Sequence, residues 1–242
     1  MATDGSAVRI AVLFPHLLGT YGDGGNGLIL QQRLSMRGIA VQRLDVAVDE
    51  AVPEQVDLYV LGGGEDSAQL AALDRLRAGG AFARAVERGA AVFAVCAGLQ
   101  ILGSELPGAA GATVAGLGLL DLTTERGEPR AVGEVLATPT PGGPLTQTLT
   151  GYENHGGRTT LGPAATPLAT VTTGIGNGGP DGAEGALQGR ITATYLHGPG
   201  LAHNPELADY LLTLVAGELP PLDLPEVSAL REHRLHLPTP AP

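Results

Sequence analysis

The chain has 242 residues, 43% of them hydrophobic, and a formal net charge of −11. A nucleic acid or an acidic membrane surface is therefore not an expected partner, because both attract basic proteins. With one cysteine, the chain has no internal disulfide framework and no metal site built from several cysteines, and we expect no cofactor. A polar N-terminus and the lack of any apolar run near ~18 residues predict a cytoplasmic protein without a membrane span.

The first half of the chain alternates apolar runs with helical patterns. Strands are expected at residues 8–14, 39–44, 57–61 and 91–95. Helices are expected at residues 27–37, 66–77 and 82–88. A glycine-rich loop, residues 17–26, follows the first strand. This order predicts an α/β fold with a doubly wound, mostly parallel sheet.

Beyond Pro107, short apolar runs stand between Gly, Pro and Thr turns, which is typical of antiparallel strands. We expect such strands at residues 117–124, 131–137, 149–153 and 167–173, and we expect them to be added to the sheet. Residues 186–196 return to the strand pattern.

The C-terminal part begins with a clear helical pattern over residues 204–215, for which Asn204 is a suitable N-cap. We place one domain at residues 8–217. The remaining segment, 218–242, is a proline-rich tail in which a short helix is expected near residues 227–233.

Cys96 stands between an apolar strand and a helical pattern, with Ala97 and Gly98 after it. A cysteine in this position is held on a sharp turn at the carboxyl edge of the sheet, where a helix N-terminus favours the thiolate. A lone cysteine is otherwise most often a small buried hydrophobic residue. The strand–Cys–Ala–Gly–helix context favours a nucleophile.

A cysteine nucleophile needs a base, and His197 is the best candidate. It ends the apolar strand 191–196, and active groups of a parallel sheet gather at the carboxyl ends of its strands. His155, in Tyr-Glu-Asn-His-Gly-Gly, is the second candidate. His197 could instead be a hydrogen-bonded structural residue.

An acyl-transfer site also needs donors for an oxyanion. The backbone N–H of Ala97 directly follows the nucleophile, and a glycine turn with Gly63 and Gly64 ends the neighbouring strand. Glycine allows the backbone to approach a substrate closely. The glycine triplet at residues 62–64 could instead serve only as a tight turn.

Four segments together resemble the class I glutamine amidotransferases, in the branch that contains cobyric acid synthase. They are residues 61–67 (Leu-Gly-Gly-Gly-Glu-Asp-Ser), 95–103 (Val-Cys-Ala-Gly-Leu-Gln-Ile-Leu-Gly), 151–157 (Gly-Tyr-Glu-Asn-His-Gly-Gly) and 195–199 (Tyr-Leu-His-Gly-Pro). Within that branch, the stand-alone length and the opening Tyr-Gly-Asp-Gly-Gly-Asn at residues 21–26 are similar to the glutaminase subunits of lipid II isoglutaminyl synthases.

The resemblance implies that Cys96 attacks the side-chain amide of glutamine and that His197 relays protons. Gln100 matches a family position near the bound substrate. The arginine that grips the substrate in this branch falls on Arg130, with Arg126 as the alternative.

One position departs from the wider class, because many class I amidotransferases carry glutamate two residues after the histidine and this chain has Pro199. Another acid of the chain or an acid of a partner must then orient His197. Glu206 and Asp209 lie on the following helix, which we expect to carry them away. An acid from a partner subunit is therefore the expectation.

The resemblance implies a glutaminase subunit that feeds ammonia to a Mur-ligase-like synthetase subunit in a heterodimer. The ammonia would amidate the D-glutamate α-carboxyl of lipid II in peptidoglycan synthesis. No ATP-binding loop is visible, which favours activation of the acceptor on another polypeptide. The alternatives are a subunit for a corrinoid or other carboxylate acceptor, and a non-catalytic regulatory subunit on the same scaffold.

Overall fold

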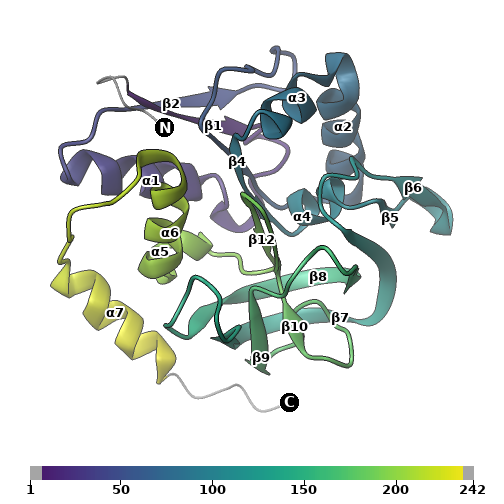
Figure 1. The fold of residues 1–242 in the computed structure, drawn as a ribbon. Helices are drawn as coiled ribbons and strands as arrows, with labels where there is room; N and C mark the ends of the chain where they lie inside the picture. The colour runs from purple at the N-terminus through teal and green to yellow at the C-terminus, as the bar shows by residue number, and fades with distance from the viewer. Residues whose placement is uncertain (1–6, 237–242) are drawn as a thin grey trace.

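The computed structural model describes residues 7–236, which form two sheets with helices around the first (Figure 1). Most of the polar N-terminal segment and the end of the proline-rich tail lie outside these residues. No helix within residues 7–236 has the length and apolar character needed to cross a membrane.

The first sheet has the strand order β11-β12-β4-β3-β1-β2. The strands are β1 (Val8–Leu13), β2 (Val41–Val46), β3 (Leu58–Leu61), β4 (Ala91–Val95), β11 (Ala186–Gln188) and β12 (Ile191–Thr194). All pairs are parallel except β11 with β12. The central strands β3, β4 and β12 are buried along their whole length. Burial on both faces explains the continuous apolar runs of β3 and β4. The predicted doubly wound, mostly parallel α/β fold is confirmed.

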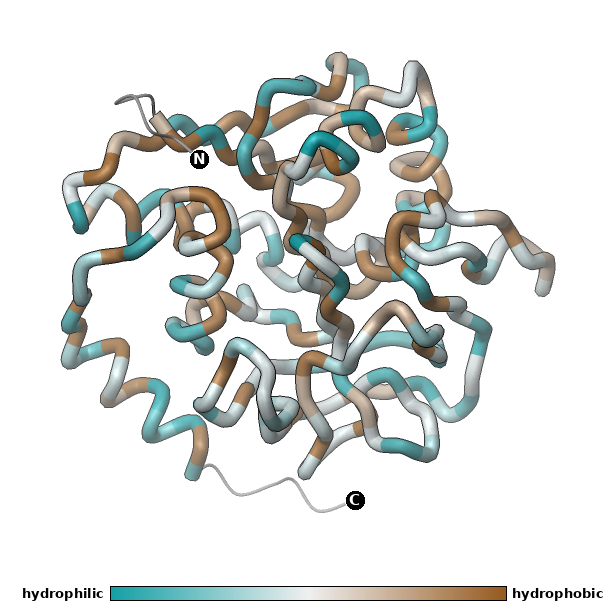
Figure 2. The backbone as a smooth tube through the Cα atoms, viewed as in Figure 1, coloured by the Kyte–Doolittle hydropathy of each residue, from teal (hydrophilic) through white to brown (hydrophobic). Residues whose placement is uncertain are grey.

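Helices cover both faces of this sheet (Figure 1). One side carries α1 (Gly25–Met36), α5 (Gly200–His203) and α6 (Pro205–Ala216), and the other carries α2 (Asp66–Arg77), α3 (Ala81–Glu87) and α4 (Ala97–Leu102). Short 3₁₀ turns occur at η1 (Thr20–Gly22), η2 (Ala78–Gly80) and η3 (Ala109–Gly111). The apolar residues in the strands and on the inner faces of the helices form the core, as the hydropathy colouring of Figure 2 shows.

Most of the antiparallel strands form a second sheet, so the expectation that they extend the first sheet is wrong. Its order is β10-β9-β7-β5-β6, with β8 paired to β7. The strands are β5 (Glu105–Pro107), β6 (Thr113–Ala115), β7 (Leu122–Pro139), β8 (Leu149–Leu161), β9 (Ala169–Thr173) and β10 (Ala183–Glu184). The antiparallel strand of the first sheet is instead β11, which pairs with β12 within the predicted strand region 186–196.

The end of the predicted strand 117–124 and the whole of 131–137 belong to one strand, β7, whereas residues 117–121 precede it. The 18 residues of β7 pair with β8 on both sides of an irregularity between Arg126 and Ala131. Glycine and proline in that interval hide the continuity in the sequence. The predicted strand 149–153 is likewise only the beginning of β8.

The two sheets meet at His197. This residue follows β12 of the first sheet, and it forms an antiparallel bridge with Tyr152 in β8 of the second. The His197 N–H donates to the Tyr152 carbonyl at 2.8 Å, and the Tyr152 N–H donates to the His197 carbonyl at 3.4 Å. The backbone of this histidine is therefore fixed by both sheets.

Two features near the C-terminus differ from expectation in detail. Asn204 precedes α6, but its side chain does not cap that helix; its Oδ1 accepts from the Thr150 N–H at 2.9 Å instead. The helix expected near residues 227–233 is longer, α7 (Pro225–Leu235). Arg231 attaches α7 to the domain, because its guanidinium donates to the His203 carbonyl at 2.7 Å.

Candidate active site

Cys96 occupies a strained turn between β4 and α4. Its φ of 50° and ψ of −104° lie in a region that residues with a side chain rarely adopt, and such backbone costs about 1–3 kcal/mol. The Cys96 N–H donates to the Thr194 carbonyl at 2.9 Å, and its carbonyl accepts from Gln100 N–H at 3.0 Å. These bonds hold the side chain at the carboxyl edge of the first sheet, as the sequence predicts for a nucleophile.

His197 stands beside Cys96 and is oriented by Asp23. The ring is 1% exposed, and its Nδ1 donates to Asp23 Oδ2 at 2.7 Å. Burial lowers the pKa of His197, but the Asp23 hydrogen bond and the neighbouring Cys96 outweigh it and raise the pKa to about 10. The other ring nitrogen, Nε2, is buried and has no hydrogen-bond partner within the described residues, so it is the atom left for proton exchange.

The expectation that no acid of this chain reaches His197 is wrong. Pro199 does occupy the position of the family's usual glutamate, and Glu206 and Asp209 bond elsewhere, to Thr146 and Arg33. Asp23 replaces them from the loop after β1, 174 residues earlier in the chain. The carboxyl ends of β1 and β12 lie at the same edge of the sheet, so the two side chains meet there.

Gly63 lies at the centre of this cluster. A Cβ there would come within 2.5 Å of His197 Cε1, 3.1 Å of Asp23 Oδ2 and 3.3 Å of Cys96 Cβ. Its N–H donates to Asp23 Oδ2 at 2.8 Å, so it is not directed at a substrate oxyanion as we expected. Gly63 instead makes room for the three side chains and supplies a second hydrogen bond that holds the Asp23 carboxylate.

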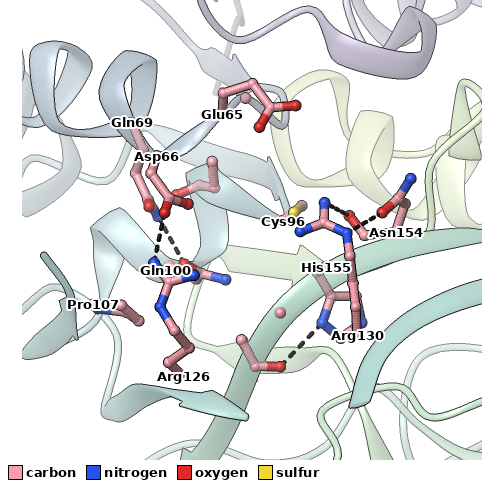
Figure 3. A pocket seen from close by; sticks show the side chains of 14 residues that line it. Glu65, Asp66, Gln69, Cys96, Gln100, Pro107, Arg126, Arg130, Asn154 and His155 are labelled. Atoms are coloured by element: carbon pink, nitrogen blue, oxygen red, sulfur yellow. Dashed lines mark hydrogen bonds and ion pairs between the residues drawn. The ribbon is translucent and has the colours of Figure 1, made fainter. Parts of the chain in front are cut away.

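A pocket opens in front of Cys96 (Figure 3). It is lined by Gly64, Glu65, Asp66, Gln69, Cys96, Ala97, Gln100, Pro107, Arg126, Arg130, Asn154, His155, Gly156 and Gly157. The structure thus brings together Cys96, Ala97, Gln100, Gly64 and both candidate arginines. One wall comes from the ends of β3 and β4 with α2 and α4, and the other comes from β7 and β8.

The two arginines differ in what they bind. Arg126 forms an ion pair with Asp66 at 2.5 Å, so its charge is compensated. Arg130 donates from Nε to the amide oxygen of Asn154 at 2.6 Å, and it has no acidic partner among residues 7–236. An uncompensated guanidinium at a pocket wall suits a substrate carboxylate, which favours Arg130 over Arg126.

Gln100 is held by a buried chain of hydrogen bonds. Its Oε1 accepts from Gln69 Nε2 at 2.8 Å, and its Nε2 donates to the Tyr195 hydroxyl at 3.1 Å. The Tyr195 hydroxyl also bonds to Thr159 Oγ1 at 2.7 Å. The amide of Gln100 therefore has one fixed orientation at the pocket wall.

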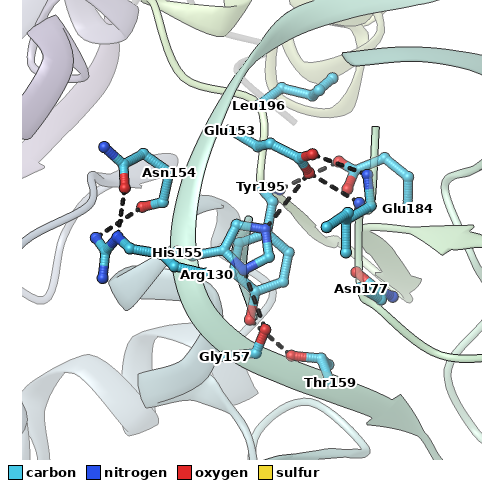
Figure 4. Close-up of polar contacts among 12 residues, drawn as sticks. Arg130, Glu153, Asn154, His155, Gly157, Thr159, Asn177, Glu184, Tyr195 and Leu196 are labelled. Carbon is cyan, nitrogen blue, oxygen red and sulfur yellow. Dashed lines mark hydrogen bonds and ion pairs between the residues drawn. The ribbon is translucent and has the colours of Figure 1, made fainter. Parts of the chain in front are cut away.

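His155, the second candidate base, forms part of the pocket wall (Figure 4). Its ring stacks on Tyr195 with centroids 3.8 Å apart, and its Nδ1 lies 3.0 Å from the Gly157 carbonyl. Its Nε2 lies 3.5 Å from Glu153, whose Oε1 accepts from Ile175 N–H at 2.8 Å. These contacts give His155 a structural role in the pocket wall, and His197 stays the candidate base.

The site contains residues that the sequence reasoning did not select, namely Asp23, Gln69 and Asn154. Asp23 carries a recognisable signal, because it is a single acid in a glycine-rich loop directly after a predicted parallel strand. Asn154 lies in the segment 151–157, but nothing in that segment indicates a role for its amide, and Gln69 carries no signal that distinguishes it from a surface amide.

Residues 9–205 match the family of CobB/CobQ-like glutamine amidotransferase domains. The chain is 36% identical over 202 residues to the subunit GatD of lipid II isoglutaminyl synthase (glutamine-hydrolyzing) from Staphylococcus aureus, a match that covers 81% of this chain and 79% of that protein. The subunit of the same name from Streptococcus pneumoniae is 32% identical over 209 residues, which cover 85% of this chain and 79% of the relative. A probable cobyric acid synthase from Methanothermobacter thermautotrophicus is 35% identical over 142 residues, but the match covers only 28% of that longer protein.

Solved structures share the fold. A glutamine amidotransferase superposes with a TM-score of 0.59 at 22% identity, covering 86% of this chain and 98% of the other. A glutamine amidotransferase from Thermotoga maritima gives a TM-score of 0.56 at 15% identity, covering 95% of this chain and 90% of the other. Since the family match spans most of the chain, this protein belongs to the CobB/CobQ-like glutamine amidotransferases.

Proposed function

We propose that this protein is the glutamine-hydrolysing subunit of a lipid II isoglutaminyl synthase. The observation that carries the proposal is the Cys96–His197–Asp23 arrangement at the carboxyl edge of the first sheet. It is supported by the two GatD relatives, whose names state that enzyme and that role.

In the proposed reaction, Cys96 Sγ attacks the side-chain amide carbon of glutamine. A cysteine acts as a nucleophile in the thiolate form, which a neighbouring imidazolium favours. The oxyanion is placed near the N–H groups of Ala97 and Gly64, both at the pocket wall. His197 Nε2 gives its proton to the leaving nitrogen, and ammonia departs, leaving a thioester on Cys96.

Water then completes the cycle. His197, now neutral, takes a proton from the water molecule as it attacks the thioester carbonyl. Collapse of the second tetrahedral intermediate releases glutamate and restores Cys96, and the proton returns to the Cys96–His197 pair. Asp23 keeps the ring in place through both steps and stabilises its charged form.

The proposed complex has a second subunit, a Mur-ligase-like synthetase in a cytoplasmic heterodimer. That subunit would activate the D-glutamate α-carboxyl of lipid II, and the ammonia from Cys96 would amidate it. Because Asp23 already orients His197, the partner is not needed to complete the catalytic base.

The decisive experiment purifies the chain with its Mur-ligase-like partner and supplies ATP, lipid II and either glutamine or an ammonium salt. The wild-type complex should amidate lipid II from both nitrogen sources. The Cys96→Ala complex should fail with glutamine and keep its rate with ammonium, which separates loss of the glutaminase from loss of the complex. Amidation of a corrinoid carboxylate instead of lipid II would contradict the proposed acceptor, and glutamine-dependent activity in Cys96→Ala would contradict the nucleophile.

A further inference from the structure

Tyr21 covers His197 from the solvent side. Its ring lies with centroids 5.0 Å from the His197 ring at 67°, and 5.8 Å from the Tyr152 ring at 61°, both edge-to-face contacts. Tyr21 is 43% exposed, whereas His197 beneath it is 1% exposed. The tyrosine therefore stands between the catalytic imidazole and bulk water.

A hydrogen-bonded chain joins Tyr21 to Arg130 through Asn154. Arg130 can only donate, so the amide oxygen of Asn154 must face its Nε, at 2.6 Å. The amide nitrogen of Asn154 is thereby turned to the Tyr21 hydroxyl, to which it donates at 2.5 Å. The Arg130 Nη2 also donates to the backbone carbonyl of Asn154 at 3.3 Å, so the guanidinium contacts both the backbone and the side chain of this residue.

The loop that carries Tyr21 depends on these contacts for its shape. Tyr21 has a φ of 60°, which is unfavourable for a residue with a side chain, and it is surrounded by glycines at 19, 22 and 24. The same loop carries Asp23, the carboxylate on His197 Nδ1. The position of Tyr21 is thus set by its ring and hydroxyl contacts rather than by the preference of its backbone.

We propose that Tyr21 is a positioning residue that links the carboxylate site at Arg130 to His197. A substrate carboxylate on the guanidinium fixes the plane of Arg130, and Asn154 transmits this orientation to the Tyr21 hydroxyl. The ring then stays closed over His197 and excludes water from the His197–Asp23 pair. The proposal deepens the proposed function, and it rests on Arg130 being the carboxylate ligand.

The test separates the hydroxyl of Tyr21 from its ring. Tyr21→Phe keeps the ring and removes the link to Asn154, so KM for glutamine should rise three- to tenfold while kcat stays within twofold. Tyr21→Ala also uncovers His197, so kcat should fall about ten- to a hundredfold in addition. Tyr210→Phe, a half-buried hydroxyl on α6, is the matched control and should change neither constant.

A double-mutant cycle tests the link itself. In an Arg130→Ala background, Tyr21→Phe should no longer raise KM, because the carboxylate site has already been lost. An unchanged KM effect in that background, or Tyr21 variants with wild-type constants, would overturn the proposal. If wild-type protein hydrolyses no glutamine, the proposed function itself fails, which is a different outcome. Melting temperatures within a few degrees of wild type would show that the kinetic changes do not come from unfolding.

Discussion

Asp23 and His197, 174 residues apart in the chain, form a buried hydrogen bond of 2.7 Å behind the candidate nucleophile. The carboxylate fixes the imidazole by its Nδ1 and leaves Nε2 without a hydrogen-bond partner among residues 7–236. A base held in this way needs no further acid from a partner. The isolated chain should therefore hydrolyse glutamine at a measurable rate.

Replacing Asp23 with asparagine tests this relationship. Asn keeps the shape but loses the charge, so it no longer stabilises the imidazolium and can favour the wrong tautomer. We expect kcat for glutamine hydrolysis to fall by roughly 10²–10⁴-fold. Asp45→Asn, which removes an exposed carboxylate from a surface ion pair, is the control and should be neutral. An Asp23→Asn variant with near-normal kcat would place the orienting acid elsewhere.

Gly63→Ala should abolish activity. The added methyl would come within 2.5 Å of His197 Cε1, so the ring must move away from Cys96. Gly200→Ala is a suitable control, because its nearest neighbour is the Leu196 Cβ at 3.8 Å, an ordinary contact. Labelling of Cys96 by a glutamine-mimicking electrophile, compared across the three proteins, measures the effect directly. Normal labelling of Gly63→Ala would show that the histidine tolerates the displacement.

The two arginines at the pocket should differ in a kinetic comparison. Arg130→Ala should weaken glutamine binding by about 1.5–3 kcal/mol, the range for a charge-assisted hydrogen bond, and so raise KM strongly. Arg126→Ala removes only an exposed ion pair with Asp66 and should change KM little. The reverse order of effects would assign the carboxylate to Arg126.

The pKa of His197 predicts how the pair contributes to stability with pH. Burial opposes the charged ring, but the bond to Asp23 and the nearby Cys96 raise its pKa to about 10 in the folded state, above the value of 6.5 in the unfolded chain. Its contribution is therefore complete below pH 6.5 and is lost as the pH rises through about 10. The difference in unfolding free energy between wild type and Asp23→Asn should shrink from pH 6 to pH 10.5. A constant difference would mean that the hydrogen bond to Asp23 does not raise the pKa of His197 in the folded state.

Glu184, a buried residue of β10, offers a second test by pH. Burial raises the pKa of Glu184 to about 7, although hydrogen bonds from the Thr194 hydroxyl and the Tyr195 N–H act to lower it. Its protonated form is favoured in the folded state, so this contribution to stability is complete below pH 4.5 and is lost as the pH rises through 7. Glu184→Gln should therefore stabilise the protein relative to wild type at pH 8 more than at pH 5. The exposed Glu87→Gln on α3 should show no such trend in denaturant titrations.

Local features of the sequence predict the turn at Cys96 well, because a buried strand, a cysteine and two small residues together favour one sharp turn there. The parallel sheet follows from its continuous apolar strands in the same way. Asp23 could not be assigned to His197 by such reasoning, since their contact depends on the lateral order of β1 and β12 in the sheet. The long β7 was missed because Gly127 and Pro129 interrupt its pattern while pairing with β8 keeps it extended.

The bridge between Tyr152 and His197 makes the site a seam between two separately built parts. The thiol belongs to the first sheet, whereas Arg130 and Asn154 belong to β7 and β8 of the second. A second bridge, between Thr166 and Leu187 of β11, also crosses from one part to the other. Because the contacts across the seam are isolated bridges and not continuous ladders, either part can keep its own hydrogen-bonded ladder while the seam opens. Loss of glutaminase activity in dilute denaturant should therefore precede the loss of secondary structure. The activity then reports how firmly the two sheets are joined.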